Sequence, residues 1–233
     1  MANLLDRIQH LPIISSFRKR FMDQLKSKGS IVVNYKGHGR NDAIEFILDT
    51  FKRTDMAMTL GEAYQIIMAV KSVEKINGDI AEVGVYKGGS ARLIAQYKGQ
   101  KTLHLFDTFQ GIPKINKIDE GFFKEGEYKG TIDEVKSVLA PYQAIKYYQG
   151  FFPDTTVQLQ PTKFSFVNFD VDTYQTTKDC IEFFYPLMNK GGVMISHDYL
   201  QIPGVRKAFD DFFSDKLEPI IQLSGTQCLI VKI

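Results

Sequence analysis

The stretch of residues 80–107 restricts the fold of this chain more than any other part of the sequence. A short apolar run containing Glu82 reaches a glycine-rich turn, residues 84–89, and then Ser90. This order predicts a strand, a tight turn and a helix start, because glycine adopts positive φ cheaply and the first helical amides lack partners. A second apolar run ends in Asp107. The stretch therefore predicts a βαβ unit with a small-molecule site at the end of its first strand.

Further apolar runs at residues 145–148, 164–169 and 193–196 alternate with helical patterns. Such alternation predicts an α/β fold with a parallel sheet, in which right-handed crossovers bring the carboxyl ends of the strands to one edge. The last two runs, residues 220–223 and 228–231, are separated by a short Gly-containing segment and predict a terminal antiparallel hairpin.

Composition limits the function classes. With 233 residues, we expect one main domain, residues 56–233, preceded by an N-terminal helical extension, residues 1–55. A net charge of +2 argues against a nucleic-acid binder, and no stretch is long enough for a membrane span. The two cysteines have no metal or redox spacing, so we expect a reducing, cytoplasmic setting.

Polar residues follow each predicted strand, and we expect them to line one cleft at the carboxyl edge of the sheet. We expect the long polar loop after Asp107 to lie over this ligand side. The linker at residues 54–59 is expected to be a plain connection, although its position would also let it border the ligand. The strand-end residues are Glu82, Asp107, Gly150, Asp170, His197 and Asp198.

Five motifs in this order resemble those of the macrocin O-methyltransferases, sugar-tailoring enzymes that use S-adenosylmethionine. The likeness extends from about residue 59 to residue 213. It implies a Rossmann-like class I methyltransferase fold, with seven strands in a mostly parallel sheet and a C-terminal antiparallel hairpin. The motifs lie at residues 82–90, 105–113, 150–155, 170–174 and 185–199.

The resemblance also implies a cofactor site. The glycine-rich turn would hold the methionine part of S-adenosylmethionine, Asp107 its ribose hydroxyls, and Gly150 and Phe151 would border the adenine. The implied cofactor-binding residues are Glu82, Gly84, Tyr86, Lys87, Gly88, Gly89, Ser90, Asp107, Thr108, Gly150 and Phe151.

By the same resemblance, Asp170, His197 and Asp198 would bind a divalent cation, usually magnesium, beside the acceptor hydroxyl. The family pattern commonly has aspartate where this chain has His197, and imidazole favours softer metals such as manganese, iron or zinc. Asp172 could add an oxygen ligand. The catalytic base is Asp170 if a metal binds, whereas His197 could accept the proton if none does.

Two other functions remain open at this stage. A nicotinamide-dependent oxidoreductase would also use a glycine turn and Asp107, although the glycine spacing here is not G-x-G-x-x-G. A non-catalytic module of the same fold would have no reason to keep so many acids in one cleft. The expected partners are a small-molecule or glycan acceptor and a second copy of the chain in a homodimer, with no nucleic acid.

Overall fold

The computed structural model describes residues 40–113 and 117–233. Residues 42–233 form one compact unit. Most of the predicted N-terminal extension lies outside the described residues, so the predicted boundary at residue 55 stays a prediction. Within the described ranges, no helix is long and apolar enough to cross a membrane.

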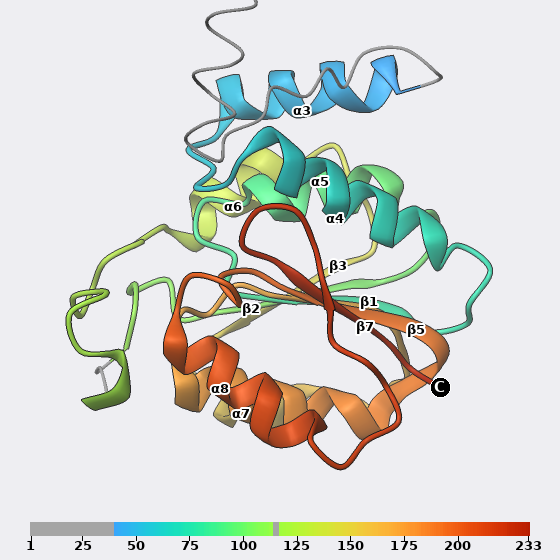
Figure 1. The fold of residues 1–233 in the computed structure, drawn as a ribbon. Helices are drawn as coiled ribbons and strands as arrows, with labels where there is room; N and C mark the ends of the chain where they lie inside the picture. The colour runs from blue at the N-terminus through green and yellow to red at the C-terminus, as the bar shows by residue number, and fades with distance from the viewer. Residues whose placement is uncertain (1–39, 114–116) are drawn as a thin grey trace, which may run out of the picture. The chain divides into compact units, whose positions relative to one another are not determined.

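A seven-stranded sheet lies at the centre of this unit (Figure 1). Its order is β3-β2-β1-β4-β5-β7-β6, with β1 to β5 parallel and β7 antiparallel to both β5 and β6. The predicted parallel sheet and terminal hairpin are therefore confirmed. The strands are β1 (Asp79–Val83), β2 (Leu103–Asp107), β3 (Ile145–Gln149), β4 (Phe164–Phe169), β5 (Met188–Ser196), β6 (Ile221–Gln222) and β7 (Cys228–Val231).

Helices cover both faces of the sheet. Figure 1 shows α4, α5 and α6 over one face and α7 and α8 over the other. Short 3-10 turns occur at η1 (Lys117–Asp119), η2 (Asp154–Gln158) and η3 (Tyr185–Leu187). The α-helices are α3 (Asn41–Arg53), α4 (Leu60–Ser72), α5 (Gly89–Tyr97), α6 (Ile132–Leu139), α7 (Tyr174–Phe184) and α8 (Pro203–Phe213).

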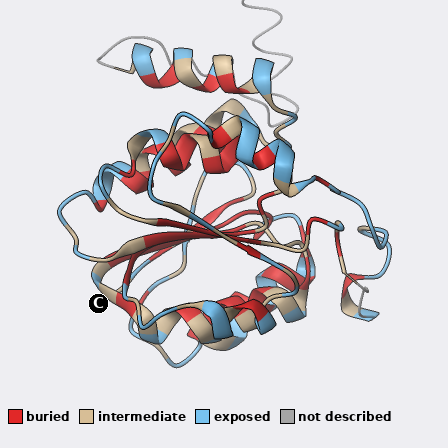
Figure 2. Cartoon of the chain, turned by 180° about the vertical axis from the view of Figure 1, so that it is seen from behind, coloured by how far each residue is buried: buried red, intermediate tan, exposed pale blue. Residues whose placement is uncertain are grey.

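Alternating side chains of the strands build two separate cores, and the helices turn their buried faces toward the sheet (Figure 2). Phe106 and Phe169 pack in the cluster that includes residues of α7 and α8. Their strand neighbours Leu105 and Phe166 pack in the cluster with residues of α4 and α5. Burial on both faces explains why these strands read as continuous apolar runs.

Local sequence signals set several helix ends. The sequence Thr131-x-x-Glu134 predicts a capping box at the start of a helix, and the structure forms it at α6, with the Thr131 amide and hydroxyl donating to Glu134. The apolar pattern before the glycines at 191 and 192 predicts a helix over about residues 176–188, but α7 ends earlier, at Phe184, where the η3 turn with Pro186 begins. Strand β5 consequently starts at Met188. Within it, the Gly191 amide donates a hydrogen bond to the carbonyl oxygen of Lys232.

Both cysteines are buried and free of disulfides. Cys180 lies in α7, and Cys228 begins β7 opposite Ser196 of β5.

Candidate active site

A cavity of about 370 Å³ opens at the carboxyl edge of the sheet. Its walls come from the linker before α4, the glycine turn after β1, the loop after β2, the turn after β3 and the polar segments after β4 and β5. The expectation that the linker is a plain connection is wrong, since residues 55–59 all line the cavity. The size and position are those of a small-molecule site in an α/β protein.

The glycine turn runs close to the strand-end backbone. Gly84 has φ +84°, and a Cβ atom there would overlap the carbonyl oxygen of Asp170. Gly88 adopts the left-handed conformation as N-cap of α5, and no side chain caps this helix. Because the turn needs positive φ and close backbone contact, glycine is required here.

Asp107 holds this turn in place. Its Oδ2 accepts hydrogen bonds from the backbone amides of Val85 at 2.6 Å and Tyr86 at 2.9 Å. Its Oδ1 accepts from the amide of Phe109 at 2.6 Å. A carboxylate offers about four lone-pair positions, so Asp107 keeps acceptor capacity toward the cavity that it lines.

Most of the predicted cofactor residues line the cavity, and three do not. Lys87 turns away to Asp55, with 3.0 Å between Nζ and Oδ2. Gly88 packs on Val135. Glu82 is fully buried in β1. The residues that line the cavity are Gly84, Tyr86, Gly89, Ser90, Asp107, Thr108, Gly150 and Phe151.

Glu82 has an unusual environment. The Asn168 amide donates to its Oε1 at 2.8 Å, while Oε2 has no hydrogen-bond partner among the described residues. Burial raises the pKa of Glu82 to about 8. Oε2 of Glu82 is thus a buried polar atom close to the glycine turn, and it can form a hydrogen bond with a ligand or a bound water.

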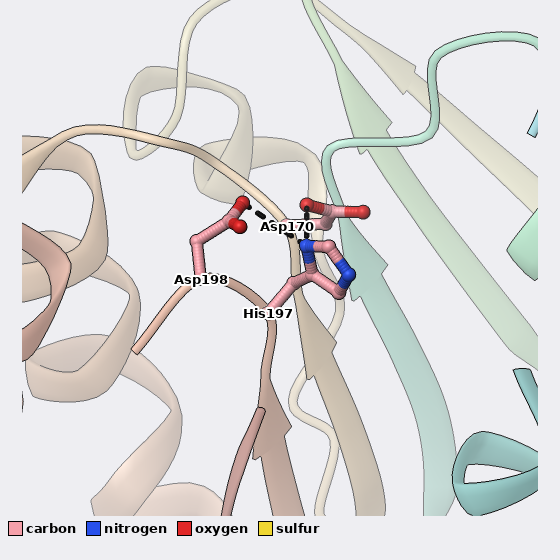
Figure 3. Close-up of side chains that lie close together, drawn as sticks. All are labelled: Asp170, His197 and Asp198. Carbon is pink, nitrogen blue, oxygen red and sulfur yellow. Dashed lines mark ion pairs between the residues drawn. The ribbon is translucent and has the colours of Figure 1, made fainter. Parts of the chain in front are cut away.

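Asp170, His197 and Asp198 come together after β4 and β5, and all three line the cavity (Figure 3). Nδ1 of His197 lies 3.0 Å from Oδ2 of Asp198 and 3.5 Å from Oδ1 of Asp170. One potential ligand atom from each residue lies within 4.8 Å of the others. The structure therefore brings together the three residues that were predicted to bind a metal.

The acids and the imidazole change each other's protonation. Burial opposes a charge on His197, but Asp170, Asp198 and Glu62 outweigh it and raise the pKa of the imidazole to about 12. Desolvation raises the pKa of Asp170 to about 6 despite the nearby imidazole. Burial and the neighbouring Asp170 and Asp198 also raise the pKa of Asp172. The cluster thus holds more acids than its one imidazole can balance, which favours a bound cation.

Sequence reasoning missed Glu62, which lies in the first turn of α4 and lines the cavity. Its Oε2 accepts hydrogen bonds from the amide and hydroxyl of Thr59, and its Oε1 accepts from the amide and hydroxyl of Thr226, all at 2.8 Å. The spacing Thr59-x-x-Glu62 is a capping-box signal that could have been read from the sequence. No sequence signal indicates that Oε2 also lies 3.6 Å from Nε2 of His197.

Aromatic side chains form the outer rim. Tyr128, from the loop after β2, packs edge-on against Tyr86 and Phe123. Burial and the charges of Asp172 and Asp198 raise the pKa of Tyr128. The expectation that this loop lies over the ligand side is confirmed, since Tyr128 and Phe123 both line the cavity.

Residues 56–227 match the family model described as macrocin-O-methyltransferase (TylF). The chain belongs to the macrocin-O-methyltransferase family. The resemblance inferred from the five motifs is therefore confirmed, and the oxidoreductase alternative is set aside.

The names of several relatives of this chain refer to sugars and natural products. It is 27% identical over 157 residues to demethyldecarbamoylnovobiocin O-methyltransferase of Streptomyces niveus, covering 59% of this chain and 58% of the relative. It is 30% identical over 156 residues to mycinamicin III 3''-O-methyltransferase of Micromonospora griseorubida, covering 59% and 61%. The matches thus span less than two thirds of the length of these relatives.

Solved structures confirm the fold. The O-methyltransferase NovP superposes with a TM-score of 0.68 at 21% identity, covering 82% of this chain and 97% of NovP. The calicheamicin methyltransferase CalS11 superposes with a TM-score of 0.65 at 19% identity, covering 87% and 99%. The seven-stranded class I fold predicted for this macrocin-O-methyltransferase family member is therefore shown.

Proposed function

We propose that this chain transfers a methyl group from S-adenosylmethionine to a hydroxyl of a sugar. One observation carries the proposal: a single cavity is lined both by the glycine turn and by the cluster of Asp170, His197 and Asp198. This arrangement provides a cofactor site and a site that activates the acceptor within reach of each other. The non-catalytic alternative gives no use for the cluster.

The residues of the turn fit the cofactor. The glycine backbone allows close approach, Asp107 lines the cavity with remaining acceptor capacity, and Oε2 of Glu82, which has no partner among the described residues, lies in the strand that leads into the turn. An electrophilic methyl group on a sulfonium is the chemistry that S-adenosylmethionine supplies when bound. The acid-rich wall also suits its positive charge.

Asp170 is the base in this proposal. With a pKa near 6, it is ionised at neutral pH and can accept the proton of an acceptor hydroxyl. The acceptor oxygen then bonds to the methyl carbon as the carbon–sulfur bond breaks, and the electron pair stays on sulfur. His197 is held in its charged form by three acids, so it cannot take that proton in the metal-free site.

The donor set also fits a divalent cation. Two carboxylates and the Nδ1 atom converge, while Glu62 lies behind Nε2 as an outer partner. A divalent cation held by Asp170, His197 and Asp198 would lower the pKa of the acceptor hydroxyl. We include this cation, magnesium or a softer metal, in the proposal.

The proposal also includes the class of acceptor, a homodimer and a cytoplasmic location. The names of the relatives support a glycosylated small molecule as acceptor, because mycinamicin III and novobiocin precursors are named as their substrates. The predicted homodimer depends on the N-terminal region, which lies outside the described residues. A cytoplasmic location remains supported by the two free cysteines.

Calorimetric titration with S-adenosylhomocysteine tests the proposal. We expect micromolar binding of this product, measured with magnesium, with manganese and with chelator, and no heat from NAD as control. Failure of S-adenosylhomocysteine to bind under all three conditions would contradict the proposed function.

A further inference from the structure

Glu62 is held in place by hydrogen bonds to both of its carboxylate oxygens. The residue is 2% exposed, and its two carboxylate oxygens accept four hydrogen bonds from Thr59 and Thr226. These partners belong to two separate segments, the N-cap of α4 and the loop between β6 and β7. The position of the Glu62 charge is therefore fixed by the fold.

This fixed charge faces one particular nitrogen. Nε2 of His197 lies 3.6 Å from Oε2 of Glu62, and among residues 40–113 and 117–233 no atom forms a hydrogen bond with Nε2. A lone pair on Nε2 would be repelled by the carboxylate, whereas an N–H is attracted. In the metal-free site the same argument also puts a proton on Nδ1, beside Asp170 and Asp198. A cation bound between these three groups would replace the Nδ1 proton, while the Nε2 proton would stay beside Glu62.

We propose that Glu62 is a positioning residue that keeps the proton on Nε2 of His197, so that Nδ1 and two carboxylates form a mixed nitrogen and oxygen site for a transition metal. Imidazole suits iron and zinc, and Mn²⁺ accepts a nitrogen ligand more readily than Mg²⁺, which prefers oxygen ligands. The site is thus expected to bind Mn²⁺ at least about tenfold more tightly than Mg²⁺. This inference rests on the cation in the proposed function, and it names which residue selects the cation.

The first test measures binding of Mn²⁺ alone by calorimetry and electron paramagnetic resonance, with no cofactor present. Replacing Glu62→Gln keeps the shape of the side chain and removes its charge, and it should weaken Mn²⁺ binding about 10- to 100-fold. Glu218→Gln is the matched control, because Glu218 is also buried and accepts hydrogen bonds from Tyr185 and Lys232, outside the cavity lining. It should leave Mn²⁺ affinity unchanged.

A double-mutant comparison separates positioning from general damage. In a His197→Asn background, the nitrogen ligand is gone, so Glu62→Gln should weaken Mn²⁺ binding by no more than about threefold further. An equal loss from Glu62→Gln in both backgrounds would show that Glu62 acts without His197, and the inference would be overturned. So would wild-type Mn²⁺ affinity in the Glu62→Gln protein, or Mg²⁺ binding as tight as Mn²⁺.

A measurement on the unaltered chain does not depend on any variant folding. In the zinc-loaded protein, long-range proton–nitrogen spectra should show His197 with a protonated Nε2 and with Nδ1 bound to the metal. Metal on Nε2 would overturn the inference. Binding of S-adenosylhomocysteine in the same samples distinguishes the two proposals. If the metal binds through His197 but S-adenosylhomocysteine does not bind, only the proposed methyl transfer is contradicted. If S-adenosylhomocysteine binds but Mn²⁺ does not, only this inference is contradicted.

Discussion

Two buried histidines lie at opposite ends of the same sheet and differ in almost everything else. His104, near the start of β2, has one carboxylate neighbour, Asp79 at 3.0 Å from Nε2, and a Tyr148 hydroxyl at 2.9 Å from Nδ1. It stacks on the ring of Tyr148 and packs edge-on against Phe164. Burial dominates there and lowers the pKa of His104, although Asp79 opposes that shift.

His197, after β5, is also buried but faces three carboxylates and a cavity, and its pKa moves in the opposite direction. The comparison teaches that a buried histidine near an acid is not by itself a sign of function. The number of surrounding charges and an adjoining cavity distinguish the site at the carboxyl end from the structural cluster at the amino end.

The largest expected difference between the two ends is in turnover. Asp170→Asn should lower turnover about 10²- to 10⁴-fold because the proposed base is lost, with S-adenosylhomocysteine affinity retained. His104→Gln, at the other end, should leave turnover unchanged. Steady-state kinetics and calorimetry on both variants check this, and an active Asp170→Asn enzyme would mean that another group takes the proton.

Two glycines give the next largest contrast. Gly84→Ala should weaken S-adenosylhomocysteine binding about 100-fold or more, because its Cβ would overlap the Asp170 carbonyl. Gly99, in the turn before β2, also has positive φ, but nothing lies within 4 Å of a Cβ there. Gly99→Ala should cost only about 1 kcal/mol of stability and leave binding intact. Equal binding losses in both variants would show that backbone strain alone is responsible.

The two histidines should also give opposite pH effects on stability in chelator-treated protein. The folded-state pKa of His197 is about 12 against an ordinary value of 6.5, so its contribution is full below pH 6.5 and is lost as the pH rises toward 12. The lowered pKa of His104 gives a contribution that is present above pH 6.5 and is lost as the pH falls below it. Each slope is at most about 1.4 kcal/mol per pH unit.

Urea unfolding of the wild type, His197→Gln and His104→Gln at several pH values measures these slopes. Relative to wild type, His197→Gln should lose the decline in the free energy of unfolding above neutral pH. His104→Gln should instead lose part of the decline on the acid side. Parallel curves for all three proteins would mean that neither histidine has a shifted pKa.

The smallest effect is expected at the exposed edge of the cavity. Asp55 accepts hydrogen bonds from the Tyr86 hydroxyl at 2.9 Å and from Lys87 at 3.0 Å, joining the linker to the glycine turn. Because exposed ion pairs are weak, Asp55→Asn should raise the dissociation constant of S-adenosylhomocysteine by no more than about fivefold. A loss as large as that of Gly84→Ala would show that the linker is a gate for the cofactor.

Sequence patterns predicted the features that depend on local signals. Apolar runs located the seven strands, and the topology of a parallel sheet placed Asp170 and His197 at one edge. Thr131 and Glu134 were readable as a capping box because both partners lie within one helical turn.

The remaining features depend on contacts between distant segments. Nothing local indicates that Glu62 meets His197, or that Asp107 uses both oxygens to hold the glycine turn. The sequence of the linker, residues 54–59, does not predict a ligand contact, and only the fold brings residues 55–59 to the cavity.

The labelling rates of the two buried thiols measure how often parts of the molecule open. Burial raises the pKa of Cys228, and this thiol lies in β7 opposite Ser196, the residue before His197. A thiol-specific reagent can label it only when the strand pair separates, so the labelling rate reports how often the hairpin beside the site detaches. Cys180, buried in α7, reports the other layer, and the ratio of the two rates tells whether the hairpin opens alone or with the whole sheet.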